Sequence, residues 1–356
     1  MALRSSALIA SRLVGCRDRL LLQHRRAAAS GLMNRHRSPG NMAKTISSNQ
    51  VSISGKPFST SAEDPIEDIV TSVQGYYDDP NALNFHMQAW GEDIHVGRYD
   101  LLNKDELENL DARERIRRAT TLSTNILLGK AFPSAGSEPL PSGYTVMDMG
   151  SAHGSTARAA AKEYGCNVVC IDVSRGFNTA NAKLSADAGL SDKILIPGDR
   201  SFFETQMPSE SMDAVLSQDA FSHASTEHHR AIEEAARVLK PGGLMAFTDL
   251  MQTGDADPAK LAEVYHQIGI TRLATPGAFV EWGKEYGLEL IEFDEKGPNL
   301  GRHYEHVSDR TLCPAPAAKA STMIQTDSRN YPQASPFVLF YPPSPRLLFS
   351  ARKPYL

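Results

Sequence analysis

The sequence predicts an α/β protein built on a doubly wound parallel sheet. Between residues 145 and 293, short apolar runs typical of buried strands alternate with segments of helical periodicity. Such alternation favours parallel strands joined by helices that cover both faces of the sheet. Glycine or polar residues follow most of the apolar runs, and ligands bind at this edge in sheets of this kind.

The first half of this segment supplies three strands and two helices. Residues 145–149 (TVMDM) form an apolar run that ends at a glycine, and the Ala-rich stretch 156–164 suits a helix. Residues 167–173 (NVVCIDV) are rich in β-branched side chains and predict the second strand. A helix over 178–188 ends at the next glycine, and 193–197 (KILIP) predicts the third strand.

The second half continues the alternation. Residues 212–217 (MDAVLS) predict a fourth strand, and 226–239 shows charged and apolar faces at helical spacing before the breaker KPGG. Residues 244–249 (LMAFTD) predict the fifth strand. The remaining elements are helices over 258–268 and 276–286, each opened by a proline, and a sixth strand over 288–293 (LELIEF).

Charge is spread unevenly along the 356 residues, whose formal net charge is −5. Residues 1–62 hold ten basic side chains and one acidic one, and residues 311–356 hold five and one, so the part between them is strongly acidic. An acidic body repels phosphate backbones and argues against nucleic-acid binding. The basic head combines Arg and Ser with leucines at helical spacing, which is typical of an organelle transit peptide, mitochondrial rather than plastid.

These patterns divide the chain into four segments. Residues 1–62 are a transit peptide and linker, with the mature chain expected to begin between Ser30 and Glu63. Residues 63–142 form an N-terminal helical cap, and 143–310 form the sheet domain. The tail, 311–356, holds eight of the 21 prolines and is expected to be irregular, with strands conceivable only at 337–341 and 347–350.

Composition excludes several other classes of protein. The four cysteines are too few and too scattered for a disulfide scaffold, and the spacing of Cys166 and Cys170 does not fit a zinc site, so no metal is expected. His228 and His229 also lack a zinc spacing and are expected at the surface of their helix. The apolar runs fall short of the roughly 18 residues of a membrane span.

A glycine loop follows the first strand. It spans 148–154 (DMGSAHG), with Gly150 where the chain turns and Gly154 at the start of a helix whose N-terminal amides are free. The spacing G-x-x-x-G does not match the G-x-G-x-x-G of dinucleotide sites. It resembles the first motif of class I S-adenosylmethionine-dependent methyltransferases, with Ala152 in place of a middle glycine. Asp148, Ser151 and both glycines are therefore candidate cofactor-binding residues.

Polar residues after the next strands fit the same site. Asp172 ends the second strand about twenty residues after the loop, where an acid can accept both ribose hydroxyls. Asp199 follows the third strand, in position to bind an adenine amino group, and Gln218 and Asp219 follow the fourth. The LKPGG before the fifth strand is also habitual in these methyltransferases. The resemblance implies a Rossmann-like fold and S-adenosyl-L-methionine as the cofactor.

The segments around the sheet narrow the resemblance. YYDD (76–79), WGEDIHVG (90–97), SQDAF (217–221) and ARVLKP (236–241) resemble the sarcosine/dimethylglycine methyltransferase family, which makes glycine betaine, and so does the HYE at 303–305. The similarity covers roughly 70–310 and ends near Val307. It implies that the segment before the first strand lies across the cofactor, with Trp90 beside it. Tyr76, Tyr77, His303 and Tyr304 are candidate substrate residues.

The resemblance also implies a chemistry for the site. In-line methyl transfer mainly needs alignment, and an amine must in addition lose a proton to attack. His223, Asp249 and His95 are the candidate catalytic residues, aromatic faces would stabilise a cationic product, and Arg98, Arg272 or Arg302 would hold a substrate carboxylate. The expected partner is a small-molecule methyl acceptor, and the oligomeric state stays open.

Several functions remain open at this point. The leading hypothesis is N-methylation of sarcosine or dimethylglycine. A thioether carries no proton, so S-methylation of 4-methylthio-2-hydroxybutyrate, a step towards dimethylsulfoniopropionate, fits the same fold. C-methylation of a quinone would need a wider, more apolar pocket. The unusual tail would also suit a pseudo-enzyme that binds the cofactor without transfer, whereas a dehydrogenase is disfavoured by the missing dinucleotide motif.

Overall fold

The computed structural model describes residues 65–132, 140–257, 259, 261, 262, 265, 270–294, 299–310 and 337–341. These residues belong to one compact unit that begins at Pro65. The predicted transit peptide, the predicted strand at 347–350 and most of the predicted helix at 258–268 lie outside the described residues.

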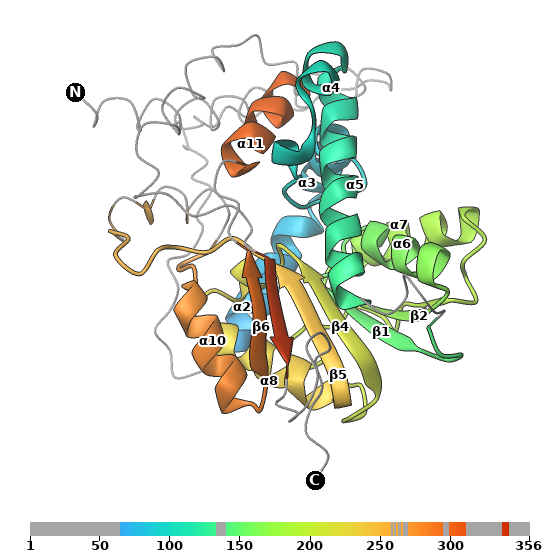
Figure 1. Ribbon diagram of the computed structural model, residues 1–356, viewed down its shortest axis with the longest axis vertical. Coiled ribbons are helices and arrows are strands. Elements are labelled where there is room, and N and C mark those ends of the chain that lie inside the picture. Colours follow the sequence, from blue (N-terminus) through green and yellow to red (C-terminus); the bar gives the residue numbers. More distant parts are fainter. Residues whose placement is uncertain are drawn as a thin grey trace, which may run out of the picture. The chain divides into compact units, whose positions relative to one another are not determined.

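A seven-stranded sheet organises the unit, in the order β3-β2-β1-β4-β5-β7-β6 (Figure 1). The first five of these strands pair in parallel, as predicted, and β7 is antiparallel to both of its neighbours. The strand order reverses beside β1, so the ligand-binding crevice is expected at its carboxyl end. The strands are β1 (Thr145–Met149), β2 (Asn167–Ile171), β3 (Ile194–Leu195), β4 (Met212–Gln218), β5 (Leu239–Thr248), β6 (Glu289–Asp294) and β7 (Phe337–Tyr341).

Two predicted strands differ in length from the observed ones by three or more residues. β3 has two residues, because Pro197 has no amide to donate and Gly198 turns the chain with φ +107°. β5 begins at Leu239, five residues earlier than predicted, since Leu239 pairs with Met212 across an irregularity in the ladder. The predicted strand at 337–341 exists and lies between β5 and β6, so the segment expected to be an irregular tail completes the sheet.

The helices begin where the sequence supplies caps. Asp111 accepts from the amide of Glu114 at 2.8 Å and starts the longest helix, while Ser174 and Thr275 accept in the same way at two others. Because Ser174 is a cap, its helix starts three residues before the predicted position. The helices are α2 (Pro65–Tyr77), α3 (Pro80–Ala89), α4 (Lys104–Asn109), α5 (Ala112–Ala131), α6 (Ser155–Tyr164), α7 (Arg175–Asp187), α8 (His228–Val238), α10 (Pro276–Glu285) and α11 (Asn299–Arg310), with short 3-10 turns η1 (Tyr99–Leu101) and η3 (Phe221–Ala224).

Two apolar layers enclose the sheet, because successive strand residues point to opposite faces. Met147 and Met149 of β1 face a cluster built with α2, α8 and α10, whereas Val146 faces a cluster built with α5 and α6. This is the helix-covered parallel sheet that the alternation predicts.

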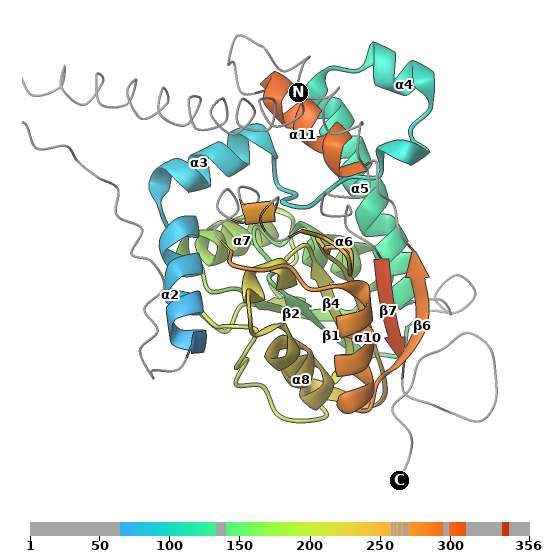
Figure 2. The same cartoon turned by 90° about the vertical axis from the view of Figure 1, so that its left-hand side faces the viewer.

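Helix α5 links the sheet to the cap. Its C-terminal part carries Leu127 and Leu128 into the sheet core, and its N-terminal part carries Ile116, which packs with Ala89 of α3 and Val307 of α11. Figures 1 and 2 show α3, α4 and α11 beyond the carboxyl ends of the parallel strands. The segment predicted as a cap therefore covers the expected ligand edge and is anchored to the sheet by one long helix.

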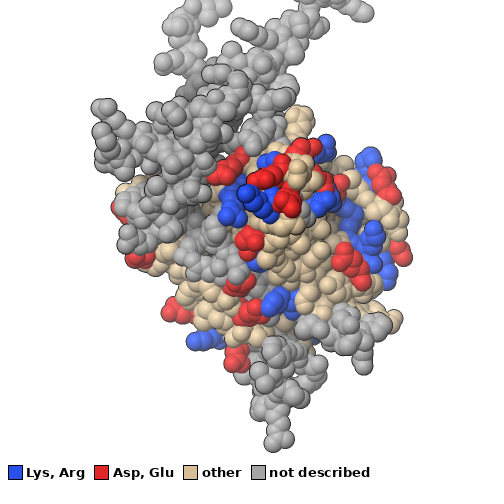
Figure 3. Space-filling model, turned by 45° about the horizontal axis from the view of Figure 1, so that its top comes forward, with Lys and Arg blue, Asp and Glu red and all other residues tan. Residues whose placement is uncertain are grey.

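Both signs of charge are distributed over the described surface. On the face in Figure 3, basic and acidic side chains are interspersed. Within the described ranges, no helix is long and apolar enough to cross a membrane. A search of the same residues finds no cluster of three or more His, Cys, Asp or Glu that could hold a metal ion.

His228 is buried, which corrects the prediction that it lies at the surface. It is 2% exposed, and its ring stacks on Trp282 at 6.0 Å and meets Phe279 edge-on at 5.8 Å. The helix does present an exposed face, but His228 lies on the face that packs against α10. Burial, with Arg272 and His229 as smaller causes, lowers the pKa of His228 to about 3.

This burial predicts acid lability. Because the pKa of His228 is lower in the folded chain than the ordinary 6.5, its contribution is complete above pH 6.5 and is lost as the pH falls towards 3. Between pH 7 and pH 5 the loss amounts to about 2 kcal/mol of unfolding free energy. Urea unfolding at pH 7 and pH 5 measures this loss of unfolding free energy. The loss should be smaller by about this amount in His228→Phe than in the unmodified protein. Equal losses in the two proteins would contradict the assignment.

Candidate functional site

The glycine loop turns tightly between β1 and α6. Gly150 has φ +76°, and a Cβ there would lie 2.3 Å from the Cβ of Ala220. Gly154 has φ +74°, and a Cβ there would lie 2.0 Å from the Oδ1 of Asn181. The loop is thus fixed by backbone conformation and by close neighbours, which explains both glycines without reference to a ligand.

Asp172 holds the loop against the end of β2. Its Oδ2 accepts from the amide of Ala152 at 2.8 Å and its Oδ1 from the amide of Ser174 at 2.9 Å. Burial raises the pKa of Asp172 to about 6 although these amides act in the opposite direction. Asp199, which pairs with Asp172 as an isolated bridge, accepts from Asn178 and Arg175, each at 3.0 Å. The two predicted nucleoside-binding acids therefore lie side by side.

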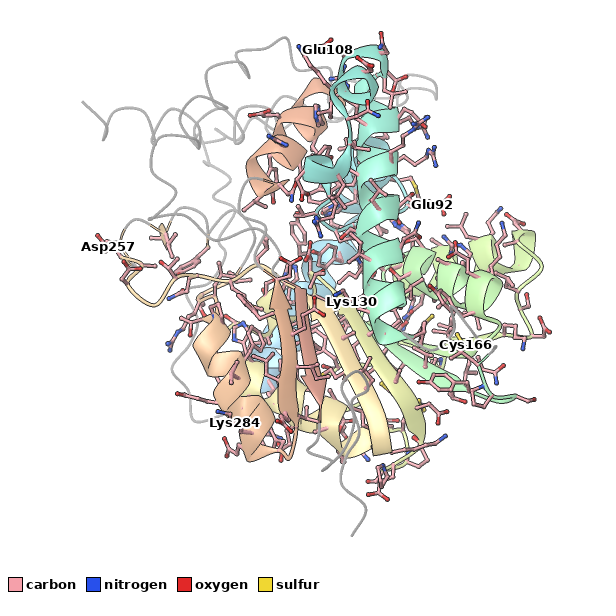
Figure 4. The ribbon with its side chains drawn as sticks, viewed as in Figure 1. Glu92, Glu108, Lys130, Cys166, Asp257 and Lys284 are labelled. Carbon is pink, nitrogen blue, oxygen red and sulfur yellow. The ribbon has the colours of Figure 1, made fainter. Side chains whose placement is uncertain are left out.

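A small cavity that is partly open to solvent lies between the loop and the cap. Five predicted site residues line it, namely His95, Asp148, Gly150, Ser151 and Gln218. The rest of its lining consists of Glu92, Ile94, Ala152, Ser155 and Thr156, which were not among the predicted site residues. Figure 4 shows Glu92 beside α5 on the side of α6.

Asp148 lines this cavity, and its charge depends on the pH and on what is bound beside it. The side chain is 2% exposed, and its Oδ2 has no hydrogen-bond partner among the described residues. Burial, with Asp172 as the second cause, raises the pKa of Asp148 to about 7. A cation bound beside Asp148 would favour its ionised form and lower this pKa.

Asp219 and Asp249 place two more acids at the ends of β4 and β5. Asp219 takes φ +54° and accepts from the amide of Val96 at 2.7 Å, which ties the cap to the sheet. Asp249 is fully buried, and its Oδ1 accepts from the amides of Ser222 and Leu250. Burial, with Asp219 as the second cause, raises the pKa of Asp249 well above its ordinary value. This candidate catalytic residue therefore holds η3 in place, and the raised pKa favours its protonated form.

A hydrogen-bonded pair connects the cap to η3. The hydroxyl of Tyr77, the last residue of α2, lies 2.9 Å from Nε2 of His223. Burial lowers the pKa of His223 to about 4, so in neutral solution the imidazole is uncharged. In the tautomer that carries its proton on Nδ1, Nε2 accepts from the tyrosine. Asp172 and Tyr304 both raise the pKa of Tyr77, in addition to burial, which places the pair beside the acids and the aromatic groups of the site.

Further aromatic rings lie on α2, on α11 and just after α3. Tyr76 meets Tyr77 edge-on at 4.9 Å, and Trp90 lies 4.4 Å from His303 and 5.8 Å from Tyr304, all between ring centroids. His303 is fully buried, and its Nδ1 lies 3.0 Å from the hydroxyl of the buried Tyr99. The four predicted substrate residues and Trp90 thus share one region of the cap.

Some contacts at the site were not predicted. Asp78 of the YYDD segment accepts from the hydroxyl of Ser174 at 2.6 Å and from the amide of Gly176 at 3.0 Å, so it joins the cap to the start of α7. Glu92 pairs with Arg158 at 2.6 Å across the cavity edge. Both acids lie in segments on which the family resemblance rests, and the resemblance was the feature of the sequence that could have pointed to them.

The arginines expected to bind a carboxylate are placed differently. Arg98 forms a bidentate pair with Asp100, at 2.8 and 2.9 Å, and lies 3.9 Å from Asp294. Arg272 and Arg302 are exposed. The arrangement therefore does not support a carboxylate clamp by Arg98.

Comparisons with known proteins agree with this geometry. Residues 147–247 match the family model of a methyltransferase domain. A sarcosine/dimethylglycine N-methyltransferase from Aphanothece halophytica is 33% identical over 240 residues, which cover 67% of this chain and 80% of that protein. The chain belongs to the sarcosine/dimethylglycine N-methyltransferase family. It is an S-adenosylmethionine-dependent methyltransferase with the class I Rossmann-like fold.

Two further proteins place the chain in the same family. A dimethylglycine N-methyltransferase from Parasynechococcus marenigrum is 34% identical over 237 residues, covering 66% of this chain and 78% of that protein. A crystal structure from Galdieria sulphuraria, assigned to the sarcosine dimethylglycine methyltransferases, superimposes with a TM-score of 0.61 at 26% identity. The match covers 72% of this chain and 96% of that one.

The residues of this methyltransferase fit its cofactor. Among the described residues, Oδ2 of Asp148 and Nε2 of Gln218 have no hydrogen-bond partner, and both side chains line the cavity, which suits an amino-acid group. Asp172 and Asp199 are the acids available to the nucleoside. Because Gly150 lacks a side chain, the backbone of the loop is open to close approach by a ligand.

Proposed function

We propose that this family member N-methylates sarcosine and dimethylglycine, towards glycine betaine. The observation that carries the proposal is the concentration of acids at the site, with Asp148, Asp172 and Asp219 at or beside the ends of three neighbouring strands. Tyr77 and Tyr304 add π faces beside these acids. Acids and aromatic faces together stabilise a cation, such as a methylated amine.

This charge pattern bears on the alternative acceptors. 4-Methylthio-2-hydroxybutyrate is an anion without a positive group, so the acids would repel it, whereas dimethylglycine carries an ammonium group. A quinone would need a wide apolar pocket, whereas the candidate substrate residues Tyr76, Tyr77, His303 and Tyr304 all carry polar groups. The relatives at 33% and 34% identity are also named for N-methylation. β7, which completes the sheet, weakens the argument for a pseudo-enzyme with a damaged tail.

Tyr77 and His223 suit the deprotonation that an amine requires. S-adenosylmethionine supplies an electrophilic methyl group when bound. With the His223 proton on Nδ1, the hydroxyl of Tyr77 donates to Nε2, so the lone pairs of its oxygen are available to accept the ammonium proton of the substrate. That proton moves to the Tyr77 oxygen as the phenolic proton moves to Nε2, which frees the amine lone pair. With a pKa of about 4, the imidazolium of His223 then releases its proton in neutral solution.

Methyl-labelled cofactor tests the proposal. Protein beginning at Glu63 is offered sarcosine, dimethylglycine or 4-methylthio-2-hydroxybutyrate, and label is counted in each product. We expect label on both amines at rates at least about tenfold above that on the thioether, because of the charge preference. Label confined to the thioether acid would replace the proposal with sulfonium synthesis.

We also propose that residues 1–62 direct this methyltransferase to the mitochondrial matrix. The support is the composition of the segment, ten basic residues and one acidic one with leucines at helical spacing. Residues 1–62 fused to a fluorescent protein should colocalise with a mitochondrial marker, and Arg→Glu substitutions in the segment should abolish this. Plastid or diffuse fluorescence of the unmodified fusion would refute the proposal.

A further inference from the structure

Side chains from three parts of the chain meet around the amide of Gln218. Its Oε1 lies 2.7 Å from the hydroxyl of Thr156, at the start of α6, and 3.1 Å from the hydroxyl of Thr124, in the middle of α5. The same Thr124 hydroxyl lies 3.2 Å from Nε2 of His95, in the cap segment. All four side chains are buried.

The protons of this group can be assigned. Each threonine hydroxyl donates its single proton to Oε1, and two such bonds use both lone pairs of that oxygen. The other end of the amide, Nε2, is buried and has no partner among the described residues. The two threonines therefore fix the amide so that its N–H groups are left for a ligand in the cavity that Gln218 lines.

His95 completes the arrangement. Because Thr124 has given its proton to Gln218, it can only accept from His95, so Nε2 of His95 carries a proton. Nδ1 lies 3.4 Å from the carbonyl of Val96, beyond the usual range for a strong hydrogen bond, and does not compete. His95 thus acts through Thr124, and this differs from the prediction that it is a catalytic residue.

The amide of Gln218, a hydrogen-bond donor, and the carboxyl group of Asp148 both line the cavity. The amide of Gln218 offers N–H groups, and Asp148 offers a carboxyl oxygen that has no partner among the described residues. An amino-acid group offers the matching pair, a carboxylate and an ammonium. We propose that Gln218 donates to the α-carboxylate of the cofactor's methionine end, and that Thr124, Thr156 and His95 are positioning residues that hold its amide in the donating orientation.

Binding of truncated ligands tests this proposal directly. S-adenosylhomocysteine carries the amino-acid group, and 5′-methylthioadenosine carries the same nucleoside without it. By calorimetry, Thr124→Val should weaken binding of S-adenosylhomocysteine about threefold, and the double variant with Thr156→Val at least about tenfold, because the amide loses its orientation. Binding of 5′-methylthioadenosine should change by less than about twofold.

Matched variants separate positioning from general damage. Thr124→Ser keeps the hydroxyl and should restore the affinity for S-adenosylhomocysteine. Thr121→Val makes the same change about one turn earlier on α5, where the exposed hydroxyl bonds to the carbonyl of Arg117 at 2.7 Å, and should weaken neither ligand. Gln218→Glu should weaken S-adenosylhomocysteine more than the double variant does, because it sets a carboxylate against a carboxylate. Equal weakening of both ligands, or no weakening of either, would overturn the proposal.

Discussion

Gly154→Ala is expected to destabilise the fold by about 3 kcal/mol and to weaken binding of S-adenosylhomocysteine about 100-fold. The new Cβ would lie 2.0 Å from Oδ1 and 2.3 Å from Cγ of Asn181. Asn181 is fully buried, and its Oδ1 already accepts from Ser185 at 2.9 Å, so the side chain has no room to withdraw. The glycine loop must move instead, and it forms a wall of the cavity.

Gly165→Ala is the matched control for this substitution. Gly165 has φ +71°, close to that of Gly154, but a Cβ there would meet nothing within 4 Å. It should therefore cost about 1 kcal/mol for the left-handed conformation alone, with unchanged ligand affinity. Urea unfolding and calorimetry measure both quantities, and similar results for the two variants would show that the contact with Asn181 is unimportant.

Tyr77→Phe is expected to lower kcat for dimethylglycine about 100- to 1000-fold, with little change in KM. The ring and its packing remain, and the hydroxyl that lies 2.9 Å from His223 is removed. Tyr164→Phe serves as the control, because Tyr164 packs against Phe132 at the far end of α6. Its kcat should stay close to that of the unmodified enzyme.

A double-mutant cycle tests whether the two side chains work as a unit. His223→Phe should lower kcat by a similar factor, and the double variant should be little worse than either single one, since each removes the same proton path. Fully additive losses would mean that Tyr77 and His223 act independently. A decrease confined to KM would assign Tyr77 to binding alone.

The features of this methyltransferase that can be predicted from the sequence are those that depend on short stretches of neighbouring residues. The parallel strands follow from apolar runs, and Asp148, Asp172 and Gln218 are found because each comes at the end of a run, where parallel strands present their ligands. The position of Asp219 follows in the same way. Spacing along the chain is enough for these features.

Other features depend on contacts between distant segments. Thr124 lies 94 residues from Gln218, and nothing in its neighbourhood on α5 marks its hydroxyl as part of the cofactor site. β7 is separated from β5 and β6 by long stretches of sequence, so its antiparallel place between them does not follow from its own composition. His228 is buried because of α10, which lies about 50 residues further along the chain.

The most direct test of a cation-binding site compares two ligands of the same shape. Glycine betaine carries a quaternary nitrogen where 3,3-dimethylbutanoate carries a quaternary carbon, and the two are otherwise alike. With S-adenosylhomocysteine bound, we expect calorimetry to show betaine binding at least about tenfold more tightly, because the acids and aromatic rings of the site act on its charge. Equal affinities, or a preference for the uncharged group, would contradict the account.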